Sequence, residues 1–143
     1  MREAIGNSFF TTISIVFLLL IMSLLVASLT YSKAYKAKNK VVAVIEKYNG
    51  WTDAARNEVD QDLFRMGYKT NTNNNTCRQI ENMTLVHDTR AGVYDYCVYR
   101  VSSGRGEYYH SVTFMHFDVP IVGQYLNLEV KGDSRTIYKD LEG

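Results

Sequence analysis

The stretch FFTTISIVFLLLIMSLLVASL, residues 9–29, decides the fold of this 143-residue chain, and TYSKAYKAKNKVVAVIEKY, residues 30–48, follows it directly. Residues 9–29 contain no charged side chain. A helix rises about 1.5 Å per residue, so this segment would be roughly 30 Å long, which matches the hydrocarbon core of a bilayer. We therefore predict that it forms a retained, single-pass membrane span.

Two other interpretations of this segment were weighed. A buried helix of a soluble protein is the first, although such helices rarely run this long without a charge. A cleaved signal peptide is the second, with Arg2 ahead of the apolar run and small residues at Val26-Ala27-Ser28. The apolar run is longer than the roughly 7–15 residues usual in a signal peptide, which favours a retained anchor.

Helical periodicity continues beyond the predicted span. Six residues at spacings of three and four form one stripe along the helix: Tyr31, Tyr35, Lys38, Val42, Ile45 and Tyr48. Val41 and Val44 broaden this stripe. Asn49-Gly50 is a typical helix stop. We expect one helix over residues 9–48, apolar in its first half and amphipathic in its second. Residues 1–30 would be the transmembrane segment, and residues 31–143 a globular head that includes the amphipathic half.

The remainder predicts an α+β head. A second, short helix would begin at Thr52 or Asp53 and end at Gly67, with one apolar face formed by Ala55, Val59, Leu63 and Met66. We expect the charged residues of this helix to form a solvated face: Arg56, Glu58, Asp60, Asp62 and Arg65.

Residues 69–84 are polar and rich in asparagine, which predicts a long loop or a weak edge strand, and an antiparallel sheet of about four strands would include the residues that follow. Residues 93–101 and 107–117 form a hairpin candidate around Gly104 and Gly106. Pro120 and Gly123 indicate a bend. Residues 124–130 alternate between apolar and polar, KGDS (131–134) predicts a turn, and 135–139 would close the sheet.

Two features disagree about which side of the membrane the head occupies. Four lysines cluster just after the span: Lys33, Lys36, Lys38 and Lys40. By the positive-inside rule, this cluster places the head in the cytoplasm. Cys77 and Cys97 indicate the opposite, because an exported domain would pair them and gain roughly 3 kcal/mol from a loop of about 20 residues. Two unrelated buried thiols are the alternative.

The residues of the chain do not form an enzymatic pattern. His110 and His116 would lie roughly 20 Å apart along one strand, too far to hold one metal, and His87 is separate. Asp60 and Asp62 are explained by the polar helix face. The net charge of +1 gives no field for nucleic acid. We expect no catalytic, cofactor-binding or metal-binding residue, no nucleic-acid partner and no small-molecule substrate.

The span itself carries a weak assembly signal. Ser23 and Ala27 have the small-x-x-x-small spacing that allows two helices to approach closely in a membrane.

Several fragments carry a resemblance to a known family: MREAIG (1–6), YSKAYKAKNKVVAVIEKYNG (31–50), LFRMGYKT (63–70), FDVPIVGQYLNLEV (117–130) and KGDSRTIYKD (131–140). With the layout of the chain, they resemble type IV pilins and, more specifically, the small membrane proteins of bacterial tight-adherence (Tad-like) pilus clusters, such as TadE-like proteins. The resemblance implies a cytoplasmic N-terminus and an extracytoplasmic head. It also implies helix packing with other pilin-like subunits in a surface filament, or fimbrium.

The resemblance makes Gly6 the candidate processing site. Pilins typically carry Glu five residues after the cleaved glycine, whereas this chain has Thr11 there and Glu3 upstream. An unprocessed signal-anchored accessory factor and a minor pilin lacking that glutamate are therefore both open. Two other function classes remain: an outward-facing, membrane-tethered binding or sensor domain with a tyrosine-rich sheet surface, and a membrane protein with a cytoplasmic head.

Overall fold

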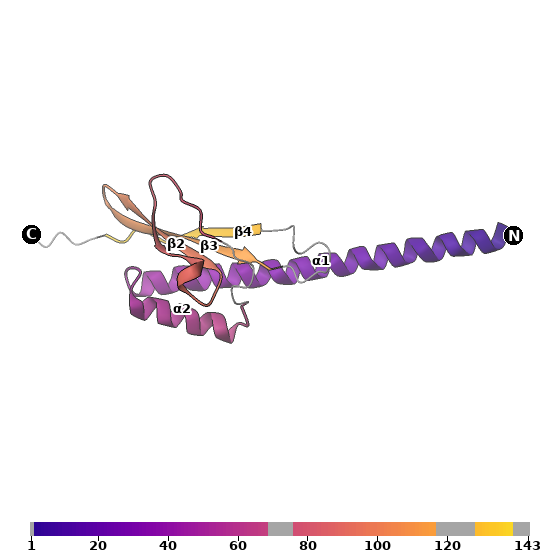
Figure 1. Cartoon of the computed structure of the whole chain (residues 1–143), viewed down its shortest axis with the longest axis horizontal. Coiled ribbons are helices and arrows are strands. Elements are labelled where there is room, and N and C mark those ends of the chain that lie inside the picture. Colours follow the sequence, from indigo (N-terminus) through magenta and orange to yellow (C-terminus); the bar gives the residue numbers. More distant parts are fainter. Residues whose placement is uncertain (1, 69–75, 117–127, 139–143) are drawn as a thin grey trace, which may run out of the picture.

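A single long helix carries the head of the protein (Figure 1). The computed structural model describes residues 2–68, 76–116 and 128–138, with side-chain surroundings from residue 5 onward. The element order is α1(Arg2–Lys47), α2(Asp53–Arg65), β1(Thr84–His87), the 3-10 turn η1(Thr89–Ala91), β2(Tyr96–Ser103), β3(Gly106–Met115) and β4(Leu128–Asp133). The fold is α+β, as predicted.

Helix α1 is continuous because nothing interrupts its backbone hydrogen bonds after the predicted span. Its 46 residues correspond to roughly 69 Å at 1.5 Å per residue. It ends where Asn49 and Gly50 adopt positive φ values of 51° and 147°, and the Gly50 amide donates to the Ile45 carbonyl at 3.0 Å. The N-terminal half projects from the head, and the C-terminal half runs along it.

The face of α1 that packs on the head agrees with the predicted stripe at Val41, Val44 and Ile45 and differs from it nearer the N-terminus. Small and branched residues form it, and all are buried: Ala34, Ala37, Val41, Val44 and Ile45. Tyr31 and Tyr35 lie outside this face and are exposed. The alanines allow the helix backbone to approach the sheet more closely than tyrosines would, so they form the contact.

Helix α2 lies beside α1 and contributes the apolar face that its periodicity predicts. Thr52 caps it by accepting a hydrogen bond from the Ala55 amide at 3.2 Å, and Gly67, with φ of 62°, follows its end. Ala55, Val59 and Leu63 are fully buried against α1 and the sheet.

The sheet has the order β1-β2-β3-β4, with each neighbouring pair antiparallel. One face packs on the two helices through Tyr96, Val98 and Tyr109. The opposite face carries Cys97, Tyr99, Val112 and Phe114, and part of the segment before β1 covers it through Cys77, Ile80 and Met83. The sheet is therefore buried on both faces over much of its area.

Three details of the predicted sheet were wrong. Strand β1 occupies residues 84–87, at and beyond the end of the predicted loop. Residues 131–133 continue β4 where a turn was expected. Of the predicted closing strand, the described residues 135–138 make only one bridge, between Ile137 and Glu107. The predicted bend at Pro120 and Gly123 lies outside the described residues.

Candidate functional site

The first half of α1 presents an apolar surface on all sides. Every residue from 5 to 26 is exposed, and this stretch is long and apolar enough to cross a membrane. Five hydroxyl groups on this stretch or just beyond it donate to a carbonyl about one turn earlier in the helix: Thr11, Thr12, Ser14, Ser23 and Thr30. Such internal bonding lowers the cost of placing a hydroxyl in hydrocarbon.

The two residues predicted to mediate helix assembly have different surroundings. Ser23 is exposed and donates to the Leu20 carbonyl at 2.8 Å, whereas Ala27 is half-buried. Val26, Leu29 and Thr30 line a pocket together with residues of the head, so the head begins to cover α1 at this level. Gly6 lies within α1, in open surroundings.

The second half of α1 is part of the core of the head. The Thr113 hydroxyl, on β3, donates to the Ala34 carbonyl at 3.0 Å, a buried bond between helix and sheet. Ile45, Val41 and Leu63 are completely buried in the cluster that α1, α2 and the sheet share. The apolar half of α1 is therefore continuous with a helical segment that is packed into the core of the head.

Charged residues of α2 attach it to α1. The Lys47 ammonium donates to both Glu58 carboxylate oxygens, at 2.8 and 2.7 Å, and the Tyr48 hydroxyl donates to the same carboxylate. These hydrogen bonds raise the pKa of Lys47 and lower that of Glu58. Lys40 pairs with Asp62 at 3.2 Å, one level nearer the membrane segment.

The expectation that these charges form a solvated face was therefore wrong for most of them. Asp60 accepts a hydrogen bond from the Tyr96 hydroxyl at 3.1 Å, and burial raises the pKa of that tyrosine. Arg56 donates to the Ala91 carbonyl, across from α2. Their partners come from α1, β2 and η1, so periodicity within α2 could not reveal them. Arg65 remains exposed.

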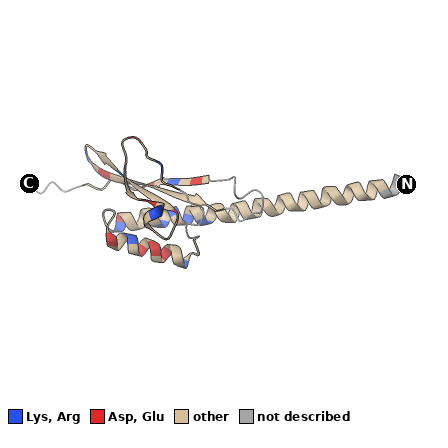
Figure 2. Ribbon diagram, in the orientation of Figure 1, with Lys and Arg blue, Asp and Glu red and all other residues tan. Residues whose placement is uncertain are grey.

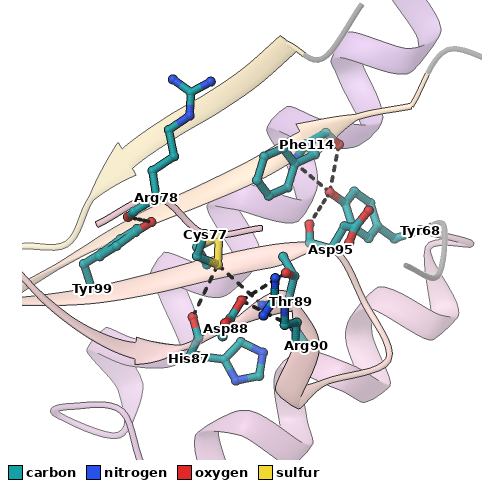
Figure 3. Close-up of a disulfide and its surroundings, with 11 residues drawn as sticks. Tyr68, Cys77, Arg78, His87, Asp88, Thr89, Arg90, Asp95, Tyr99 and Phe114 are labelled. Carbon is teal, nitrogen blue, oxygen red and sulfur yellow. Dashed lines mark hydrogen bonds between the residues drawn. A yellow bond between two sulfur atoms is a disulfide. The ribbon is translucent and has the colours of Figure 1, made fainter. Parts of the chain in front are cut away.

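A disulfide joins Cys77 to Cys97, which lies on the outer face of β2 (Figure 3). It holds residues 76–83 against the sheet, and the Tyr99 hydroxyl adds a bond to the Arg78 carbonyl at 2.7 Å. The pairing favoured by the sequence is thus present. Pairing of this kind is typical of oxidising compartments.

Among the described residues, the sheet does not expose a continuous surface of tyrosines. Tyr96, Tyr99 and Tyr109 in the strands are buried, and so is Tyr94 just before β2, whereas Tyr108 in β3 is half-buried. The exposed tyrosines among the described residues lie elsewhere, on or near α1 and close to the C-terminal end: Tyr31, Tyr35, Tyr48 and Tyr138.

A buried polar cluster fixes the membrane-proximal end of the sheet. The Tyr68 hydroxyl lies 2.9 Å from the Asp95 carbonyl and 2.8 Å from that of Phe114, and it accepts from the Phe114 amide at 3.0 Å. Burial raises the pKa of Tyr68. The side chains of Asp95 and His116 approach within 3.5 Å nearby. Sequence patterns did not indicate this cluster, because its members come from three separate segments.

The three histidines occupy separate places. His87 is buried, stacked on Tyr96 at 4.4 Å and next to Trp51. Burial, with a contribution from the Arg56 guanidinium, lowers the pKa of His87 to about 4. His110 contacts Asp133 on β4. Within the described part of the chain, no three side chains of metal-binding type gather at one point.

Comparison with known proteins finds no match: no family model, curated protein or solved structure is significantly similar to this chain. The function is therefore inferred from the geometry above.

Proposed function

We propose that this protein is a membrane-anchored, pilin-like structural subunit or accessory factor of a bacterial surface filament. The N-terminus would be cytoplasmic and the head extracytoplasmic. The observation that carries the proposal is the two-part character of α1. Its first half is an exposed apolar rod, and its second half is buried in the head without a break between them.

The mechanism of such a subunit would be packing. In the bilayer the apolar half is solvated by lipid, and it can exchange lipid for the helices of other subunits. Because α1 is continuous with the core, helix packing would position the heads. Ser23 would let neighbouring helices approach, whereas the half-buried Ala27 lies where the head begins to limit access.

The disulfide supports the outward orientation. Disulfides persist in oxidising compartments and are rare in the cytosol. We therefore assign the lysines after the span a role other than setting topology. The resemblance of the sequence to Tad-like pilus proteins is consistent with the same orientation.

The test compares helix association in membranes for three forms of the full chain. A Ser23→Leu substitution adds bulk at the proposed contact, and Ser14→Leu adds the same bulk nine residues earlier, on the opposite side of the helix. We expect Ser23→Leu to reduce co-purification with filament components and in-membrane cross-linking, and Ser14→Leu to retain both. Fractionation and negative-stain microscopy would contradict the proposal if the wild-type protein never associated with filaments.

A further inference from the structure

The turns of α1 that follow the apolar segment carry lysines that have no carboxylate partner among the described residues. Among the described residues, no carboxylate lies within ion-pairing distance of Lys33 or Lys36, and both are exposed. Lys40 and Lys47, farther along the same helix, are paired with carboxylates of α2. Along α1, the lysines without a carboxylate partner among the described residues thus lie nearer the membrane segment than Lys40 and Lys47 do, and Figure 2 shows blue residues on α1 at the edge of the tan, uncharged rod.

These lysines border a hollow whose walls change from apolar to cationic. A pocket of about 430 Å³ is lined by Val26 and Leu29 of the apolar segment, by Lys33, and by head residues that include Tyr68. A neighbouring hollow of about 240 Å³ shares Lys33 and Tyr68 and adds Lys36 and Met66. The lining therefore passes from hydrocarbon-like to cationic in the direction that leads out of a bilayer.

The depth of Lys33 matches the head-group layer, and Lys36 lies about one helical turn farther out. Lys33 lies four residues beyond Leu29, or about 6 Å along the helix axis, and Lys36 lies about 10 Å beyond it. The head-group region on each side of a bilayer is roughly 5–7 Å thick. Tyr31 and Tyr35, stacked with ring centroids 6.2 Å apart, are exposed at the same level, where interfacial tyrosines commonly lie.

We propose that this junction binds an anionic phospholipid. The phosphate would lie between the ammonium groups of Lys33 and Lys36, and an acyl chain would follow Val26 and Leu29. Charge complementarity and continuity with the apolar segment select a lipid over a soluble anion, because a soluble anion would leave the apolar wall of the pocket unused. This inference rests on the membrane anchoring in the proposed function and is independent of filament assembly.

The experiment uses the full chain in nanodiscs of equal parts phosphatidylglycerol and phosphatidylcholine, with retained lipids counted by native mass spectrometry. A lysine near a membrane surface favours anionic lipid by about fivefold, so we expect phosphatidylglycerol to be retained at least fivefold over phosphatidylcholine. The Lys33→Gln/Lys36→Gln variant should bring this ratio close to one. The control Arg100→Gln/Arg105→Gln removes the same charge from the β2–β3 hairpin, whose exposed arginines lie far from the membrane segment, and should keep the preference.

Equal retention of the two lipids by the wild-type protein would overturn the proposal, as would an equal loss of preference in the control. The experiment distinguishes failure of membrane anchoring from failure of the lipid site. A chain that floats with vesicles of neither composition contradicts the proposed span, whereas a chain that inserts into both without preference contradicts only the lipid site.

Discussion

Truncating Ile45 to alanine tests whether the second half of α1 is the core of the head. Ile45 is completely buried in the cluster formed by α1, α2 and the sheet. The substitution removes three carbon atoms, and at roughly 0.8 kcal/mol per buried methylene the transfer term alone is about 2.4 kcal/mol. The cavity left behind adds to this loss, so we expect a decrease of about 3 kcal/mol in the free energy of unfolding.

Urea unfolding of the full chain in detergent, followed by tryptophan fluorescence, measures this loss. Trp51 is the only tryptophan, and it lies 5.3 Å from the His87 ring and 6.0 Å from that of Tyr96, so its emission reports on the core of the head. We expect the midpoint to fall by roughly 1–3 M urea. Leu24→Ala, an equal truncation in the exposed apolar half, should leave the midpoint unchanged. A loss below about 1 kcal/mol for Ile45→Ala, or equal losses in both variants, would refute the inference that α1 is the core of the head.

Three further predictions concern the head. Replacing Cys77 and Cys97 with serine should lower its stability by about 3 kcal/mol, and intact mass before and after reduction should differ by about 2 Da in the wild type. His87 has a folded-state pKa of about 4, below its unfolded value near 6.5, so the free energy of unfolding should fall by about 2–3 kcal/mol as the pH falls from 6.5 to 4. The His87→Gln variant should lack this fall, which urea midpoints measured across that pH range can show. Gly106→Ala should destabilise the head by more than about 1 kcal/mol, because the backbone has φ of 155° and a Cβ would lie 2.5 Å from the Ile137 carbonyl oxygen. Gly104 lies in open space, so Gly104→Ala should keep the stability of the wild type when thermal melts of the two variants are compared.

The elements that were predicted correctly have local causes. The continuity of α1 and its C-terminal end, the face and ends of α2, and the β2–β3 hairpin follow from periodicity and from Gly, Asn and Thr at the boundaries, whereas α1 begins seven residues earlier than predicted. The pairing of Cys77 with Cys97 was favoured because an exported head of this size would gain stability from the loop. Each of these signals is contained within one stretch of sequence.

The elements that were missed depend on contacts between distant residues. The sequence of residues 131–133 predicts a turn, but these residues continue β4. Gly132 lies so close to α1 that a Cβ there would be 2.4 Å from the Lys38 side chain. Strand β4 ends opposite His110, and beyond it Glu107 bridges Ile137, so the described residues 135–138 form no further strand. Strand β1 is only four residues long and is defined by its pairing with β2.

The same reasoning explains the candidate site. An uncharged run of apolar residues is visible in any sequence, so the membrane segment was predicted. The predicted packing face of α1 included Tyr31 and Tyr35, because hydrophobicity alone does not reveal that the helix contacts the sheet through small residues such as Ala34. The partners of Glu58 and Asp60 could be identified only after α2 was placed beside α1 and β2.

Labelling of introduced cysteines in intact cells tests most directly whether the head is displayed outside the membrane on a single span. Ser102, in the exposed end of β2, and Ser8, near the start of α1, lie on opposite sides of the apolar segment, and Cys77 and Cys97 are occupied by their disulfide. With a membrane-impermeant maleimide, we expect Ser102→Cys to be labelled without permeabilisation and Ser8→Cys to be labelled only after it. Labelling of Ser102→Cys only after permeabilisation would place the head in the cytoplasm and contradict the proposed function.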